Sequence, residues 1–163
     1  MKQHEPPTIK LTFLKRKSLL ALIDNSIKGG DNYLFRNLYA KDEHGNELDI
    51  LRNGNLSCAV FVSALLLNLE LIKKPHSTVS GTEKDLFESG WKETRELKPG
   101  TVLIWEKVVF EDNTKHRHIG FYVGNNEAVS NNAEAGFPRR HDVTYNGSRR
   151  VEKIYWHPDL DKG

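Results

Sequence analysis

The sequence predicts an α+β domain on three observations. Residues 58–72 are apolar on almost every side, which is typical of a helix buried in a core. Short runs rich in β-branched and aromatic residues follow, and a Gly-Asn-Asn-Glu segment between two of them is a strong hairpin signal. The helical patterns come first and the antiparallel strand patterns come after them, an order typical of this class. The expected strands cover residues 101–105 with an extension at 108–110, then 119–123, 128–130 and 151–156.

The first third of the chain predicts mostly helix and loop. After a tail over about residues 1–12, apolar side chains recur at helical spacing over residues 15–27 and stop before Gly29. A second short helix is expected over residues 33–39. Residues 41–55 are polar, contain two glycine turns and would deliver the chain to Cys58.

The buried helix that starts at Cys58 is the expected centre of the fold. Lys73-Lys74-Pro75 ends it, and a capped short helix is expected from Thr82 to Glu88. Leu97-Lys98-Pro99-Gly100 then forms a turn into the first strand.

Length and charge limit the possible functions. A chain of 163 residues is enough for one domain, 1–163, in which residues 1–50 form a helical N-terminal extension or cap and residues 51–157 the core. With 24 basic and 22 acidic side chains, the net charge of +2 gives no bulk attraction to nucleic acid or membranes. We expect neither partner, and a monomer. Residues 1–7 lack the basic start and apolar stretch of a secretory signal, so the chain as written is expected to be cytoplasmic unless another route exports it.

Cys58 is the only cysteine, so it cannot form an internal disulfide and needs its own explanation. It stands where a polar loop enters the central helix. A helix N-terminus favours thiolate over thiol and can bind an oxyanion. A cysteine nucleophile also needs a base and a group that orients that base. His118, which opens a strand-like run sixty residues later, is the candidate base.

Two residues are candidates for orienting His118. In a two-residue hairpin closed by Asn125-Asn126, Asn131 falls opposite Gly120, on the same sheet face as His118. Its amide oxygen could accept the imidazole N–H, which makes it the first choice. A one-residue bulge in that hairpin would bring Ser130 to this place instead.

Three segments resemble the NlpC-type, papain-like cysteine peptidases of bacterial cell-wall metabolism. They are Ser57-Cys58-Ala59-Val60-Phe61-Val62, Leu97-Lys98-Pro99-Gly100-Thr101-Val102 and His118-Ile119-Gly120-Phe121-Tyr122-Val123-Gly124-Asn125. Their order and spacing agree with that family over residues 55–131. Ser57 and Thr101 each stand where the family usually has Asp, and an ungapped alignment puts Ser130 at its third catalytic position, often His.

The resemblance implies a papain-like fold, with a central helix on an antiparallel sheet of about five strands and extra N-terminal helices. It also implies an amide hydrolase without a cofactor, in which Cys58 attacks a carbonyl, His118 carries the proton and an acyl-enzyme is hydrolysed. The implied substrates are peptides of peptidoglycan, and the amidases of the CHAP type are related. The oxyanion hole would use the Cys58 N–H and a second donor, either Ser57 or an Asn of the 53–55 loop.

Other interpretations fit the same residues. The scaffold could serve a thiol acyltransferase or a protein deamidase, or it could be an inactive domain that binds a ligand in its cleft. An inhibitor or immunity protein is a conceivable partner. His116 and His118 alternate on one strand and could chelate a metal, but no zinc-like spacing accompanies them, so no metal is expected. His141 is expected to be a solvent-exposed loop histidine.

Overall fold

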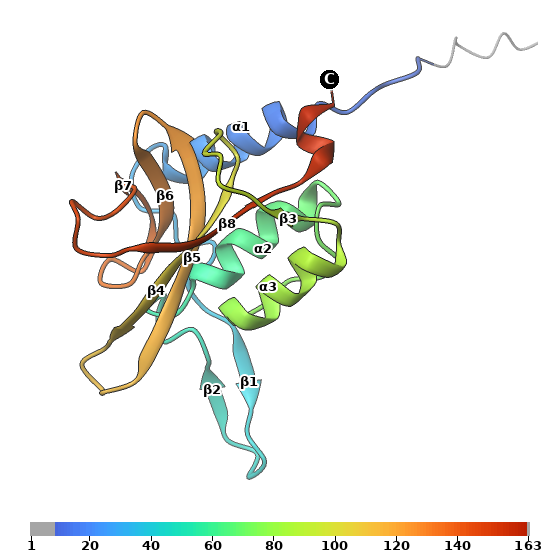
Figure 1. Ribbon diagram of the computed structural model, residues 1–163. Helices are drawn as coiled ribbons and strands as arrows, with labels where there is room; N and C mark the ends of the chain where they lie inside the picture. The colour runs from blue at the N-terminus through green and yellow to red at the C-terminus, as the bar shows by residue number, and fades with distance from the viewer. Residues whose placement is uncertain (1–8, 163) are drawn as a thin grey trace, which may run out of the picture.

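The computed structural model describes residues 9–162, so the start of the predicted tail lies outside the described residues. Three α-helices accompany a six-stranded antiparallel sheet and a separate two-stranded sheet, which confirms the α+β class (Figure 1). The strand order of the large sheet is β3-β8-β4-β5-β6-β7. The elements are α1 (Lys15–Ile27), β1 (Tyr39–Lys41), β2 (Glu47–Asp49), α2 (Cys58–Asn68), α3 (Val79–Glu88), β3 (Lys92–Glu93), β4 (Val102–Val109), β5 (Lys115–Gly124), β6 (Glu127–Asn132), β7 (Phe137–Asp142), β8 (Val151–Trp156) and the 3-10 helix η1 (Pro158–Asp161).

Helix α2 is the buried central helix, as its composition predicts. Its side chains pack on β5 and β6, and Phe61 makes edge-on ring contacts with Phe35 and Phe121. The helix ends at Asn68 and does not continue to Ile72, because Glu70 takes a positive φ of 55° and turns the chain. Because the apolar side chains of α2 anchor it to the sheet, its N-terminal residue Cys58 has a fixed position.

The register of β5 and β6 decides which side chain lies beside His118. The ladder shifts between Tyr122 and Gly124, so Gly120 pairs with Ser130 instead of Asn131. This is the bulged alternative. A Cβ on Gly120 would lie 2.6 Å from Ser130 Cβ and 3.0 Å from a ring carbon of Trp105. Glycine at this position therefore lets Ser130 and the Trp105 ring pack closely against β5.

The N-terminal third differs from the prediction after α1. The prediction of a second helix over residues 33–39 is wrong, because the chain turns there and begins strand β1 at Tyr39. Asp42 accepts hydrogen bonds from the backbone N–H groups of His44 and Asn46, which closes the β1–β2 hairpin. This hairpin extends away from the body of the molecule (Figure 1). The N-terminal region described is thus one helix and a hairpin, not several helices.

The sheet has six strands, where the resemblance implies about five. The four strands located in the sequence correspond to β4, β5, β6 and β8, and the sequence does not indicate β7 or the short β3. Strand β7 (Phe-Pro-Arg-Arg-His-Asp) places only Phe137 and Pro138 in buried positions, so no apolar alternation marks it. Helix α3 begins at Val79 because the Thr78 side chain accepts the Gly81 N–H as its cap, ahead of the expected start at Thr82. Among the helices of residues 9–162, none has the length and apolar character needed to span a membrane.

Candidate active site

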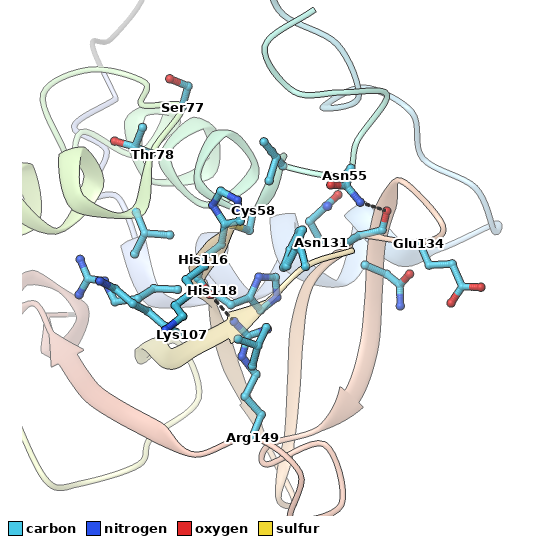
Figure 2. A pocket seen from close by; sticks show the side chains of 18 of the residues that line it. Asn55, Cys58, Ser77, Thr78, Lys107, His116, His118, Asn131, Glu134 and Arg149 are labelled. Carbon is cyan, nitrogen blue, oxygen red and sulfur yellow. Dashed lines mark hydrogen bonds between the residues drawn. The ribbon is translucent and has the colours of Figure 1, made fainter. Parts of the chain in front are cut away.

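Cys58 and His118 line one cleft of about 750 Å³, together with Asn55, Asn131 and Arg149 (Figure 2). The cleft gathers the N-terminus of α2, strands β5 and β6, and the loop that joins β7 to β8. The topology thus brings together the two residues that sequence spacing singled out as nucleophile and base. No hydrogen bond joins their side chains directly within the described structure.

Burial raises the pKa of the Cys58 thiol. The backbone N–H groups of Ile119 and Ala59, and the nearby Arg149 charge, act in the opposite direction and lower it. The N–H groups at the helix N-terminus thus favour the thiolate, as expected, but burial has the larger effect and the net shift of the Cys58 pKa is upward. Near neutral pH the sulfur carries its proton until a base removes it.

The His118 imidazole is buried and hydrogen-bonded to Ser130, with 2.8 Å between Nε2 and Oγ. Burial, followed by the positive charge of Arg149 and the neighbouring His141, lowers the pKa of His118 to about 3. The ring is thus neutral over the physiological range. A neutral imidazole has a lone pair that can accept a proton, but a pKa of about 3 makes this ring a weaker base in the resting site than an ordinary histidine.

Asn131, the first choice for orienting His118, bonds to the loop before Cys58 and not to the imidazole. Its Nδ2 donates to the Gly54 carbonyl at 2.6 Å, which fixes the end of the loop that enters α2. Its Oδ1 is buried and has no hydrogen-bond partner among residues 9–162. Asn131 therefore lies in the cleft wall and holds the loop before Cys58, while Ser130 contacts the imidazole.

The candidates for a second oxyanion donor differ in their surroundings. Ser57 precedes α2, but its hydroxyl neither caps the helix nor finds a partner within the described residues, and it is fully buried. Asn55 lines the cleft and its Nδ2 makes one long hydrogen bond, 3.4 Å, to the Ala133 carbonyl. Asn55 is thus the better placed of the two to donate to a ligand beside Cys58.

Arg149 is a further residue of the site that no motif in the sequence singles out. Arg149 is half-buried and donates to two backbone carbonyls, from Nε to Glu106 at 3.0 Å and from Nη2 to His116 at 3.0 Å. These bonds hold the guanidinium at the cleft, where its charge acts on both Cys58 and His118. Only the long-range packing of the β7–β8 loop on β4 and β5 brings it there, and no local pattern signals this.

His116 and His118 do not form a shared metal site. His116 Nε2 lies 2.7 Å from Thr114 Oγ1 and its ring packs on Phe110, whereas His118 turns to Ser130. Within residues 9–162 no three His, Cys, Asp or Glu side chains are grouped as metal ligands would be.

Comparison with known proteins adds no assignment. The chain matches no protein-family model, and it matches no curated protein.

Proposed function

We propose that this protein is a cysteine hydrolase that cleaves peptide or amide bonds, with peptides of peptidoglycan as its substrates. The observation that carries the proposal is the hydrogen bond of 2.8 Å between His118 Nε2 and Ser130 Oγ, in a cleft that also contains Cys58. It occupies one imidazole nitrogen and leaves Nδ1 to act as the base. A nucleophile, a base and a group that orients the base are the three parts that acyl transfer through a thiol requires, and Cys58, His118 and Ser130 are the candidates for them.

The chemistry follows from the protonation states of the resting site. His118 Nδ1 takes the proton from the Cys58 sulfur as the sulfur forms a bond to the substrate carbonyl carbon. The carbonyl oxygen becomes an oxyanion, which the Cys58 N–H at the start of α2 and the Asn55 side chain stabilise. The imidazolium then gives its proton to the leaving amine as the C–N bond breaks. Water, deprotonated by the same imidazole, hydrolyses the acyl-enzyme and restores the thiol.

The charges around the cleft support an anionic substrate. Lys107, Lys115, Arg117 and Arg149 line it, against one acidic side chain, Glu134. Glu83 pairs with Arg117 at 2.7 Å and neutralises that charge, but Arg149 contacts only carbonyl oxygens through its hydrogen bonds. A guanidinium with donors to spare is suited to a carboxylate. Peptidoglycan stem peptides carry free carboxylates, which fit this requirement.

Digestion of purified sacculi tests the activity. We expect the wild-type protein to release cleaved stem peptides, identified by mass spectrometry, and Cys58→Ala to release none. If wild-type protein leaves muropeptides intact but hydrolyses or deamidates other peptides, the cell-wall substrate is wrong. If it binds peptides without any turnover, the hydrolase itself is wrong.

Two neighbouring arginines offer a matched test of the substrate charge. We expect Arg149→Gln to raise KM for a carboxylate-bearing peptide at least tenfold, but to change KM little for the same peptide with that carboxylate amidated. Arg150→Gln is the control. The Arg150 side chain is 75% exposed, and its charge is paired with Glu106, with 3.8 Å between Nε and Oε2. Equal effects of Arg149→Gln on both peptides would contradict a carboxylate contact.

A further inference from the structure

We propose that His141 is a positioning residue that acts through Ser130 to keep the His118 proton on Nε2. The inference rests on the proposed hydrolase, because it names what prepares the base of that reaction. Three hydrogen bonds carry it, and they run from a backbone carbonyl of β7 to the imidazole in the cleft.

The first hydrogen bond fixes the tautomer of His141. Its Nδ1 lies 2.7 Å from the carbonyl oxygen of Asp142. A carbonyl oxygen can only accept, so Nδ1 carries a hydrogen. Burial lowers the pKa of His141, although the Asp142 carbonyl and carboxylate oppose this, so the ring is neutral and has only that one N–H. Its Nε2 must therefore be an acceptor.

The directions of the second and third hydrogen bonds then follow from the number of hydrogens available. Ser130 Oγ lies 2.7 Å from His141 Nε2, so the single hydroxyl hydrogen of Ser130 points to His141. Ser130 can therefore only accept from its other neighbours, His118 Nε2 at 2.8 Å and the Tyr145 hydroxyl at 3.1 Å. His118 carries its hydrogen on Nε2, and Nδ1 keeps the lone pair. If Ser130 instead donated its hydrogen to His118, His141 would have to donate to Ser130 from Nε2 while also donating to Asp142 from Nδ1. His141 would then be doubly protonated and cationic, beside Arg149 in a buried site.

The aromatic packing keeps this arrangement in place. The His141 ring stacks on Tyr145, with centroids 4.0 Å apart and 14° between the planes. Trp105 packs against both histidine rings, at 5.3 Å from His118 and 5.6 Å from His141. Its Nε1 donates to the Val143 carbonyl at 2.7 Å, which ties this ring to the chain just after β7. His141 therefore has little freedom to turn away from Ser130.

Nitrogen NMR of the ¹⁵N-histidine-labelled protein near neutral pH tests the inference directly. The wild type should show His118 with its hydrogen on Nε2, and the spectrum of His118→Gln assigns the signals. His141→Phe keeps an aromatic ring for Tyr145 to stack on but offers no acceptor, so the Nδ1–H form of His118 should gain population. His141→Gln, whose amide oxygen can accept the Ser130 hydrogen, should restore the wild-type tautomer.

Two results would overturn the inference: a hydrogen on His118 Nδ1 in the wild type, or an unchanged His118 tautomer in a folded His141→Phe. Both readouts need no substrate, so they separate this inference from the hydrolase proposal. If His141→Phe does not fold, Ser130→Ala takes its place: it removes the hydroxyl that joins the two rings, so the Nδ1–H form of His118 should gain population there too, and an unchanged tautomer would overturn the inference.

Kinetics give a second test once a substrate is known. Loss of the correct tautomer should lower kcat by roughly ten- to a thousandfold with little change in KM. Because His141 acts through Ser130, the double variant Ser130→Ala/His141→Phe should lose no more activity than Ser130→Ala alone. Losses that multiply would mean that the two residues act independently, contrary to the inference.

Discussion

Asn131 Nδ2 donates a hydrogen bond of 2.6 Å to the carbonyl oxygen of Gly54, joining β6 to the loop that leads into Cys58. Both residues are buried, so neither group can turn to water instead. We predict that Asn131→Ala destabilises the fold by about 1–3 kcal/mol, because the Gly54 carbonyl is left buried and unpaired. Urea unfolding measures the change.

Asn25→Ala is the control for this prediction, because Asn25 is exposed on α1 and the one side-chain hydrogen bond it makes within residues 9–162 comes from the exposed Lys28. It should leave the urea midpoint almost unchanged. If the two variants unfold at the same urea concentration, the bond between β6 and the loop contributes nothing measurable.

Gly120 is predicted not to tolerate a side chain. A Cβ there would approach Ser130 Cβ to 2.6 Å and the Val129 carbonyl oxygen to 2.8 Å. Gly120→Ala should therefore cost about 1–3 kcal/mol of stability and move Ser130 away from His118. Thermal unfolding measures the cost. Adding Ser130→Gly should recover part of the stability without recovering activity, and no recovery would mean that the clash lies elsewhere.

The elements that the sequence predicts correctly are those with a clear pattern of apolar side chains that become buried. Helix α1 has its predicted bounds, and β8 matches its expected strand. The β1–β2 hairpin is missed because its residues are almost all exposed, so no apolar alternation exists to detect.

The site shows the same division between local and long-range information. A buried helix start and an apolar strand indicate Cys58 and His118. The choice between Ser130 and Asn131 depends on the bulge next to Gly124, where Asn125 and Asn126 both take positive φ values. His141 and Arg149 reach the site only through the pairing of β7 with β6 and the packing of the following loop, which no local spacing reveals.

Glu83 is predicted to make the fold sensitive to acid. Although burial raises its pKa, hydrogen bonds from Lys153, Tyr155 and Arg117 lower the pKa of Glu83 from the ordinary 4.5 to about 2. A carboxyl whose folded pKa is depressed contributes stability that is present above the unfolded value and is lost as the pH falls toward the folded one. The wild type should therefore lose stability between about pH 4.5 and pH 2.

Urea midpoints measured across this range check the prediction for Glu83. Glu83→Gln should be less stable than the wild type near neutral pH, and its stability should fall less steeply in acid. Glu43→Gln is the control, because the Glu43 side chain is 87% exposed in the hairpin, and its profile should follow the wild type. An acid profile of Glu83→Gln that is as steep as that of the wild type would exclude Glu83 as the cause.

The raised pKa of Cys58 and the lowered pKa of His118 predict a resting pair of thiol and neutral imidazole rather than an ion pair. Alkylation by iodoacetamide needs the thiolate, so its rate should rise about tenfold per pH unit through the neutral range and continue to rise above about pH 8.5. Near neutral pH the rate should be lower than that of a free model thiol. His118→Gln should keep the same slope, because the wild-type imidazole does not charge in this range. A wild-type rate that is constant from about pH 5 to 8 and is lost in His118→Gln would instead mean that an ion pair forms before substrate binds.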